Sequence, residues 1–472
     1  MKAIKAFNSI LLALFGTFIE YYDYALYSFA APIFAYTFFP KSDPTVALLQ
    51  AYGIFIAGFC AKPLGSLIFS ILGDKFGRAF VLKISITGIA IPTLIIGFTP
   101  DYSLIGWVAP ALLLLARIFH GIFVSGESDN ARVFIYEMLD RKNRYLSNSL
   151  IYFICLLGIY AASFNISYAT SFASSEITVL GFRVSYWRLP FVIGGMFGIM
   201  LFYLRRCLIE STAFVKNRQK KNNHSPNSTH PYRTHPYRTH PCHTDYLNSI
   251  TQTLLSFFKD INKRSLLATL LLTGTVGGQY HFYFVFLNQY LSQMLNHYDL
   301  ASASKITSNL LLLFTLTLPV AGFVADKLTQ RFEIISLLKI SALIICATAC
   351  TNILCIWAGI LPVKVMVLTV LSLSFTHANT FIVILNQFKV SERCRGSSLG
   401  HSLGSMILSG STPFVSLWIW KTTQLPMAPL FFFLFLCGLN FAALFLVKPR
   451  IADSRTVKQI TEDNKTKTFV FN

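Results

Sequence analysis

Twelve apolar stretches run along the chain, each near the length of about 20 residues that a helix needs to cross the hydrocarbon core of a membrane. A long polar segment separates the first six stretches from the last six. The pattern predicts an all-α membrane protein with twelve transmembrane helices in two six-helix bundles. The predicted helices cover residues 10–35, 48–72, 81–100, 104–130, 148–170, 188–205, 266–291, 305–325, 334–357, 362–386, 398–420 and 427–447.

Composition agrees with a multi-pass membrane protein, since 54% of the residues are hydrophobic and only 13% are charged. The net charge of +20 suggests a nucleic-acid partner, but the placement of the charges argues against one. Of the 40 Lys and Arg residues, 31 lie in the two terminal segments, the long polar segment and every second connection between helices. This positive-inside pattern predicts that both termini lie in the cytoplasm.

We divide the chain into four parts on this basis. They are an N-terminal bundle, a cytoplasmic linker, a C-terminal bundle and a cytoplasmic tail, over residues 1–205, 206–264, 265–447 and 448–472. The linker contains three near-copies of Thr-His-Pro-Tyr-Arg between residues 229 and 244. The histidine spacing matches no compact zinc ligand set, so we expect no metal and no cofactor.

The fourth predicted helix is unusual because the segment 116–137 carries six ionisable residues. Charges inside a membrane usually face protein or water and mark an ion or substrate path. At 100° per residue, Arg117, His120 and Glu127 share one helix face, which we expect to line a transport pathway. Asp129 and Arg132 lie off that face three residues apart and are expected to pair with each other.

The first predicted helix carries Glu20, Asp23, Tyr24 and Tyr27 on one face. Two carboxylates one turn apart repel each other, and removal from water also favours their neutral form. Both effects suit a proton-binding site, and we do not separate Glu20 from Asp23 in that role. The alternative is that tyrosine hydroxyl groups satisfy the two carboxylates in a purely structural arrangement.

A charged turn between the second and third helices is expected to form a gate at the cytoplasmic face. It contains Gly73, Asp74, Gly77 and Arg78. Asp74 can act on the positive N-terminus of a neighbouring helix, and Arg78 can pair with Glu137 at the end of the fourth helix. The alternative is a positively charged turn that only fixes the membrane topology.

This turn resembles the signature of the major facilitator superfamily, Gly-x-x-x-Asp-[Arg/Lys]-x-Gly-[Arg/Lys], with Ser70 at the first glycine position. A degraded copy at residues 322–327 follows the eighth helix and contains Asp326. The resemblance implies two parallel repeats of six helices and a gate residue at Asp326.

Further motifs resemble the metabolite:proton symporters of that superfamily, which include the proline/betaine transporters. The residues that carry this resemblance are Gly16-x-x-x-Glu20-Tyr-Tyr-Asp23-Tyr, Phe38-Phe39-Pro40, Lys62-Pro63-Leu64-Gly65, Ala116-Arg117-x-x-His120-Gly121, Ser125-Gly126-Glu127, Trp187-Arg188-x-Pro190-Phe191, Leu208-x-Glu210-Ser211 and Arg393-x-Arg395-Gly396-Ser397. Lys62, His120 and Ser125 depart from the residues that the family favours. The resemblance implies symport of proline or betaine first, and of dicarboxylates or other organic acids second.

Residue roles follow from charge and from the resemblance together. Arg117 is a fixed cation that can bind a substrate carboxylate. The candidate proton carriers are Glu20, Asp23, Glu127 and His120. The other candidate substrate contacts are Tyr24, Tyr27, Gln279, Tyr280 and Tyr283, whose aromatic faces suit an amine or quaternary ammonium group.

Three other functions stay open at this stage. A proton-independent facilitator is the nearest alternative, and a non-transporting membrane sensor on the same fold is another. A membrane-embedded enzyme is disfavoured, since the histidines at 120, 281, 377 and 401 stand apart from any catalytic partner in sequence. We expect a monomer in a bacterial inner membrane that binds a small molecule and protons, with no nucleic-acid partner.

Overall fold

The computed structural model describes residues 2–40, 44–138, 144–171, 176–179, 182–210, 262–295, 299–388 and 393–448. Six long helices form the N-terminal half: α1 (Lys2–Thr37), α2 (Pro44–Phe76), α3 (Arg78–Phe98), α5 (Val108–Met138), α6 (Arg144–Ser171) and α7 (Leu189–Leu204). The short elements between them are α4 (Tyr102–Ile105), β1 (Glu176–Val179), β2 (Phe182–Ser185), η2 (Tyr186–Arg188) and η3 (Arg205–Cys207).

The C-terminal half consists of six crossings, two of which contain π-helical turns. The elements are α10 (Lys263–His281), η4 (Phe282–Phe286), α11 (Leu287–Gln289), η5 (Tyr290–Met294), α12 (Leu300–Leu328), α13 (Ile334–Trp357), α14 (Val363–Asn386), α15 (Arg393–Gly404), η6 (Ser405–Ser409), α16 (Thr412–Thr423) and α17 (Ala428–Ala443). Within the described ranges the long helical segments thus form two sets of six, which confirms the predicted fold class.

The ninth helix has the predicted bounds of residues 334 and 357, whereas α1 begins eight residues before its apolar stretch and α5 ends eight residues after its own. By length and composition, eight helices in the described ranges can cross a membrane, and α17 is a shorter apolar helix. Two features were not predicted. An antiparallel hairpin of β1 and β2 lies between α6 and α7, and π turns interrupt the seventh and eleventh crossings.

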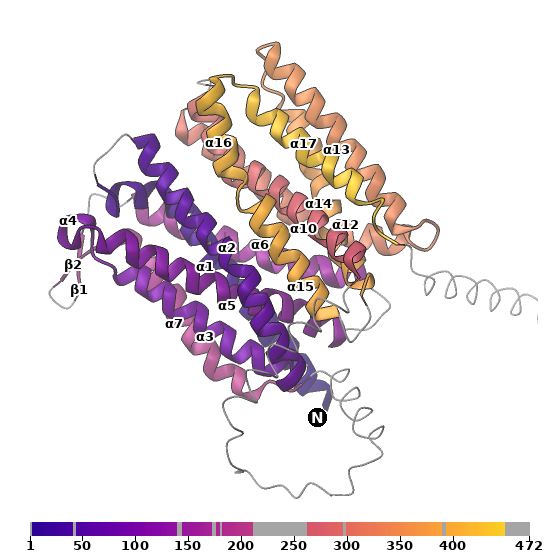
Figure 1. Ribbon diagram of the computed structural model, residues 1–472, viewed down its shortest axis with the longest axis horizontal. Coiled ribbons are helices and arrows are strands. Elements are labelled where there is room, and N and C mark those ends of the chain that lie inside the picture. The colour runs from indigo at the N-terminus through magenta and orange to yellow at the C-terminus, as the bar shows by residue number, and fades with distance from the viewer. Residues whose placement is uncertain are drawn as a thin grey trace, which may run out of the picture.

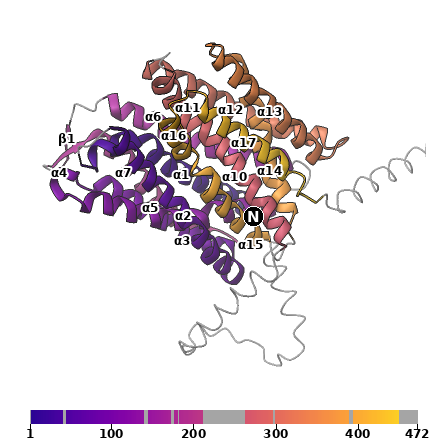
Figure 2. The same ribbon diagram turned by 45° about the horizontal axis from the view of Figure 1, so that its top comes forward.

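The two halves lie side by side, coloured indigo to magenta and orange to yellow in Figure 1. Contact between them is made by α6 against α12 and α14, and by α2 against α15 and η6. The turned view of Figure 2 shows the same arrangement, with α13 on the outside of the C-terminal half. Large apolar side chains remain exposed on the bundle, including Phe98, Phe119, Ile340 and Phe435, as a lipid-facing surface requires.

We call the end of the bundle at which α1 and α10 begin the linker end. There α2 ends at Phe76 and α3 begins at Arg78, so that only Gly77 joins them. Gly77 has φ 101°, a conformation that other residues rarely adopt, which explains the glycine in this turn. The repeat-containing part of the linker, residues 211–261, and the tail from residue 449 lie outside the described residues.

Candidate functional site

A cavity of about 130 Å³ lies between the two halves. Its walls come from α1, α2, α5 and α6 of the N-terminal half and from α10, α12, α14, α15 and η6 of the C-terminal half. A binding space at the junction of two repeats is where secondary transporters hold their substrates. We therefore take this cavity as the candidate functional site.

The N-terminal wall of the cavity carries the ionisable side chains of Glu20, Lys62 and Arg132. Glu20 is buried, and its Oε1 accepts a hydrogen bond from the Ser128 hydroxyl group. Among the described residues, Oε2 of Glu20 has no hydrogen-bond partner. The Arg132 guanidinium donates to the Tyr21 hydroxyl group, so a carboxyl group and two cations share this wall.

The C-terminal wall contributes three histidines, one from each of α10, α14 and α15. His281 lies between the two halves, because its Nε2 contacts the Tyr24 hydroxyl group and its Nδ1 lies 2.9 Å from Ser409 Oγ. His377 Nδ1 lies 3.1 Å from the Leu373 carbonyl oxygen, which fixes the ring. The imidazole rings of these histidines can be neutral, and they lie across the cavity from the ionisable groups of the N-terminal wall.

Aromatic rings fill much of the remaining cavity surface. Tyr280 lies 5.0 Å from Phe284, 6.1 Å from Phe314 and 6.0 Å from His377 between ring centroids. Tyr24 lies 5.8 Å from Phe59 in an edge-to-face arrangement. Such faces attract cationic groups and also exclude water from the charged residues near them.

Of the residues proposed for proton or substrate contact, Glu20, Tyr24 and Tyr280 line the cavity. Gln279 and Tyr283 are buried away from it, and the Tyr283 hydroxyl group accepts a hydrogen bond of 3.2 Å from Asn352. The remaining predicted residues form two other buried clusters, one around Arg117 and one around Glu127.

The Arg117 cluster lies outside the cavity lining. The guanidinium carbon stands 4.2 Å from the centroid of the Tyr27 ring and 5.5 Å from that of Phe55. His120 Nδ1 lies 3.5 Å from Arg117 Nη1. The Asp23 Oδ2 atom accepts a hydrogen bond of 3.3 Å from Thr93. Arg117 is therefore not among the residues that line this cavity, and its place on the transport pathway stays a prediction.

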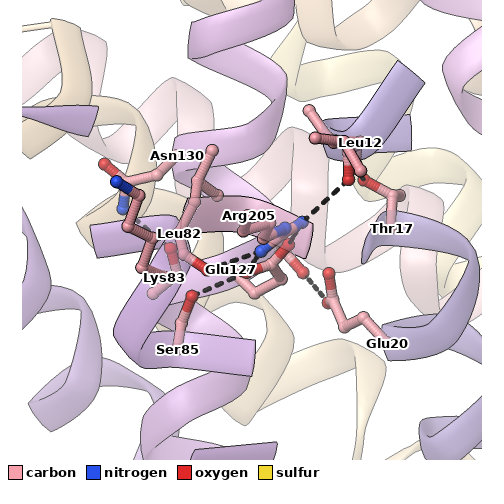
Figure 3. A network of polar contacts seen from close by, with 12 residues as sticks. Leu12, Thr17, Glu20, Leu82, Lys83, Ser85, Glu127, Asn130 and Arg205 are labelled. Carbon is pink, nitrogen blue, oxygen red and sulfur yellow. Dashed lines mark hydrogen bonds and ion pairs between the residues drawn. The ribbon is translucent and has the colours of Figure 1, made fainter. Parts of the chain in front are cut away.

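Glu127 also points away from the cavity, and it forms a buried ion pair with Arg205 at the end of α7 (Figure 3). Arg205 Nη1 and Nη2 lie 2.8 Å and 2.5 Å from the two carboxylate oxygens. Ser85 donates to the same carboxylate at 2.6 Å, and Arg205 also bonds the Leu82 carbonyl oxygen at 2.5 Å. The pair joins α3, α5 and η3 into one unit, with α1 close by.

The expected pair between Asp129 and Arg132 is not formed. Asp129 Oδ1 lies 2.9 Å from His401 Nδ1, across the boundary between the two halves. Arg132 instead lies between two rings, with its guanidinium carbon 5.0 Å from the Tyr152 centroid and 4.8 Å from that of Phe381. Spacing along one helix could not reveal these partners, because they come from other helices.

The structure describes the side chains of some of the predicted gate residues at the linker end. Arg78 Nη1 donates to the Gly73 carbonyl oxygen at 3.0 Å, and its backbone N–H bonds Glu210 at 3.1 Å. Glu210 also accepts from the Ala79 backbone N–H at 3.1 Å, so it caps the start of α3. The side chains of Asp74 and Glu137 lie outside the described residues, so the pairing of Arg78 with Glu137 stays a prediction.

Asp326, at the end of α12, contacts the other half of the molecule. Its two carboxylate oxygens accept hydrogen bonds from the backbone N–H groups of Tyr145 at 3.2 Å and Leu146 at 2.9 Å, at the start of α6. Nearby, Asn148 donates to the Ala378 carbonyl oxygen at 2.7 Å. These bonds tie the two halves together at the linker end.

Replacing Asp326 with Asn is expected to favour opening at the linker end. The variant loses a negative charge at a helix N-terminus, which is worth about 1 kcal/mol, or roughly fivefold in the population of the closed state. The native thiol of Cys155 lines the cavity and can report the change. In a chain with Cys155 as its only cysteine, labelling by a maleimide applied at the linker end should accelerate; slower or unchanged labelling would contradict the role.

Lys62, Arg132, His281 and His401 line the cavity but were not among the predicted site residues. A lysine inside an apolar stretch is itself a signal of function, yet Lys62 entered the sequence argument only as part of a family motif. The histidines stand apart in sequence and meet only in the folded chain. Within the described ranges, no group of three or more His, Cys, Asp or Glu side chains is placed to hold a metal ion.

Comparisons with known proteins agree with this geometry. The proline/betaine transporter of Salmonella typhimurium is 28% identical over 91% of this chain and 80% of its own length. The alpha-ketoglutarate permease of Escherichia coli is 26% identical over 85% of this chain and 84% of the permease. Both relatives are named as transporters rather than enzymes.

The fold is similar to that of solved transporters as well. The proton:xylose symporter XylE, bound to 6-bromo-6-deoxy-D-glucose, superposes with a TM-score of 0.70 at 15% identity, over 94% of this chain and 95% of that one. The family model described as Major Facilitator Superfamily matches residues 13–400, which is most of the chain. Because this match covers well over half of the sequence, the chain belongs to the major facilitator superfamily.

Proposed function

We propose that the protein is a proton-coupled symporter of a small zwitterionic or anionic metabolite. Proline or betaine is the first candidate, and dicarboxylates or other organic acids are the second, in keeping with the names of its relatives. The observation that carries the proposal is the buried carboxyl group of Glu20 on the cavity wall, with one oxygen that no described residue bonds. Such a group can take up a proton where a substrate binds.

We assign the proton to Glu20 in preference to the other candidates. Glu127 is held by Arg205, and protonation would leave that arginine buried without its counter-ion. Asp23 and His120 belong to the Arg117 cluster, which supports a role in coupling at a distance from the substrate. There the charge of Arg117 would attract the Asp23 carboxylate and help to fix the position of α5. Arg117 would contact the substrate directly only after a conformational change.

Alternating access between the two halves fits the contacts at the linker end, since the bonds of Asp326 and Asn148 must break for that end to open. We place both termini in the cytoplasm on the distribution of Lys and Arg, and the protein in a bacterial inner membrane as a monomer. The gate residues Gly73, Asp74, Gly77, Arg78, Glu137 and Asp326 then face the cytoplasm.

Uptake into vesicles that contain the purified protein tests the proposal. With an inwardly directed proton gradient, at least one of proline, glycine betaine, 2-oxoglutarate and citrate should accumulate above its external concentration, and a protonophore should abolish the accumulation. Counterflow whose rate does not change with the proton gradient, without accumulation of substrate, would favour a proton-independent facilitator. Absence of any uptake of the four compounds would contradict the substrate range and favour a sensor.

A further inference from the structure

We propose that Lys62 is the cation that binds the carboxylate of the substrate, and that the protonation state of Glu20 decides when Lys62 is available. This inference rests on the proposed transport function and names a group in the same cavity. It replaces Arg117, which the sequence favours for the substrate carboxylate, with a residue that reaches the cavity directly.

The ammonium group of Lys62 lies in the cavity wall against aromatic rings. Its Nζ is 4.3 Å from the centroid of Phe59 and 5.6 Å from that of Tyr24. Within the described part of the chain, Lys62 makes no hydrogen bond and no ion pair. An ammonium group has three donors, and ring faces satisfy its charge but accept no conventional hydrogen bond. A carboxylate that enters the cavity supplies the missing acceptors.

The other buried cations near this region already have partners. The Arg132 guanidinium lies close to the rings of Tyr152 and Phe381, and one of its nitrogens donates to Tyr21. Arg205 is paired with Glu127 in the wall of the N-terminal half. Among the cations on the described cavity surface, Lys62 is therefore the one whose ammonium group meets only ring faces, whereas Arg132 already donates to Tyr21.

Glu20 is the acid that shares the cavity surface with Lys62. The two groups interact electrostatically but do not meet in an ion pair, which leaves room between them for a ligand. When Glu20 is ionised, its charge attracts the ammonium group and opposes an incoming carboxylate. When Glu20 carries a proton, that opposition ends, and the free hydroxyl of the carboxylic acid is a further donor to the substrate.

Other charges in the neighbourhood modify this arrangement without replacing it. Asp129 also acts on Lys62, but its carboxylate is hydrogen-bonded to His401. The remaining ionisable groups that act on Lys62 or are acted on by it are Arg117, Arg132, His120, His281 and His401. One oxygen of Glu20 and one of Asp129 lack a partner among the described residues, but only Glu20 of these two acids lines the cavity, so we expect proton and carboxylate to bind together there.

The arrangement defines a substrate class by chemistry. The ligand must carry a carboxylate for Lys62, and its remaining part must suit the rings of Tyr24, Phe59 and Tyr280. A quaternary or secondary ammonium group on that part is favoured by the ring faces. An amide or alcohol in place of the carboxylate should bind poorly, since a hydrogen bond to a charged group is worth about 1.5–3 kcal/mol, roughly 10- to 150-fold.

The test compares carboxylates with matched analogues that lack the carboxylate. Proline is paired with prolinamide, and glycine betaine with choline, as competitors of uptake into vesicles that contain the full-length protein. The wild type should prefer each carboxylate at least tenfold.

Lys62→Gln should raise the KM for the carboxylate at least tenfold and remove most of the preference, while Lys62→Arg should restore part of it. Arg117→Gln should lower the maximal rate but keep the preference, and Lys364→Gln, an exposed lysine at the far end of α14, should change neither.

A second variant keeps the test valid if Lys62→Gln fails to fold. Glu20→Gln imitates the protonated acid, so its affinity for the carboxylate should be at least as high as that of the wild type and should no longer depend on pH between 6 and 8. Retention of the wild-type KM and preference by folded Lys62→Gln overturns the inference, as does an unchanged pH dependence in Glu20→Gln. Either result leaves uptake by the wild type, and hence the proposed function, intact; a wild type that transports none of proline, glycine betaine, 2-oxoglutarate and citrate contradicts the proposed function instead.

Discussion

Glu20→Gln is expected to abolish the accumulation of substrate driven by a proton gradient and to preserve the exchange of substrate across the membrane. Gln has the shape of the protonated acid and can still accept the hydrogen bond from Ser128. It cannot release or take up a proton, so a full transport cycle gains nothing from the gradient. We expect the concentration ratio across the membrane to stop responding to the proton gradient, while counterflow continues as in the wild type.

Asp23→Asn is the matched control, because Asp23 is one helical turn away on α1 and is also buried. If Glu20 is the proton carrier, Asp23→Asn should slow uptake without ending its response to the gradient. The opposite result, with Asp23→Asn uncoupled and Glu20→Gln still able to concentrate substrate, would assign the proton to Asp23. Loss of counterflow in Glu20→Gln would show that the side chain is needed for more than protonation.

Arg205→Leu should produce the largest loss of stability of any single substitution considered. It removes the counter-ion of Glu127, whose side chain is fully buried, and it leaves the Leu82 carbonyl oxygen without a strong donor. Leaving one charge of a buried pair unpartnered costs about 3–5 kcal/mol. We expect the thermal midpoint of the purified protein, followed by its tryptophan fluorescence in detergent, to fall by several degrees.

Glu127→Leu combined with Arg205→Leu is the matched control for this loss. Removing both charges avoids an unpaired ion in the core, so the double variant should recover much of the stability that Arg205→Leu loses. Gly16→Leu should resemble the single variant, because a side chain at Gly16 would collide with the Arg205 guanidinium. A single variant as stable as the wild type would mean that the pair contributes little.

The helices could be predicted from the sequence because a membrane demands about 20 apolar residues for each crossing. That demand acts locally, which is why the bounds of α13 and α14 are reproduced within one residue. The π turns at Phe282–Phe286 and Ser405–Ser409 could not be predicted, since they depend on packing across helices. They lie beside His281 and Ser409, which meet at the cavity.

The candidate site was predicted only in part for a related reason. The helical periodicity of α1 predicted that Glu20 and Tyr24 lie on one side of the helix, and both residues line the cavity. The same argument on α5 put Arg117 and Glu127 together on a pathway, yet they lie almost three turns apart and meet different neighbours. Arg117 contacts Tyr27 and Phe55, whereas Glu127 meets Arg205 from a distant part of the chain. Spacing along a helix indicates which side chains point in the same direction, but it does not indicate which neighbouring helix each side chain contacts.

The most direct test of proton-coupled symport is to measure proton movement when substrate is added and no gradient is imposed. Vesicles with the purified protein and a weakly buffered external medium report the flux as a change in external pH. If proline or glycine betaine enters with a proton bound at Glu20, its addition should make the medium alkaline, and Glu20→Gln should give no such signal. Entry of the substrate with no change in external pH in the wild type would contradict the account.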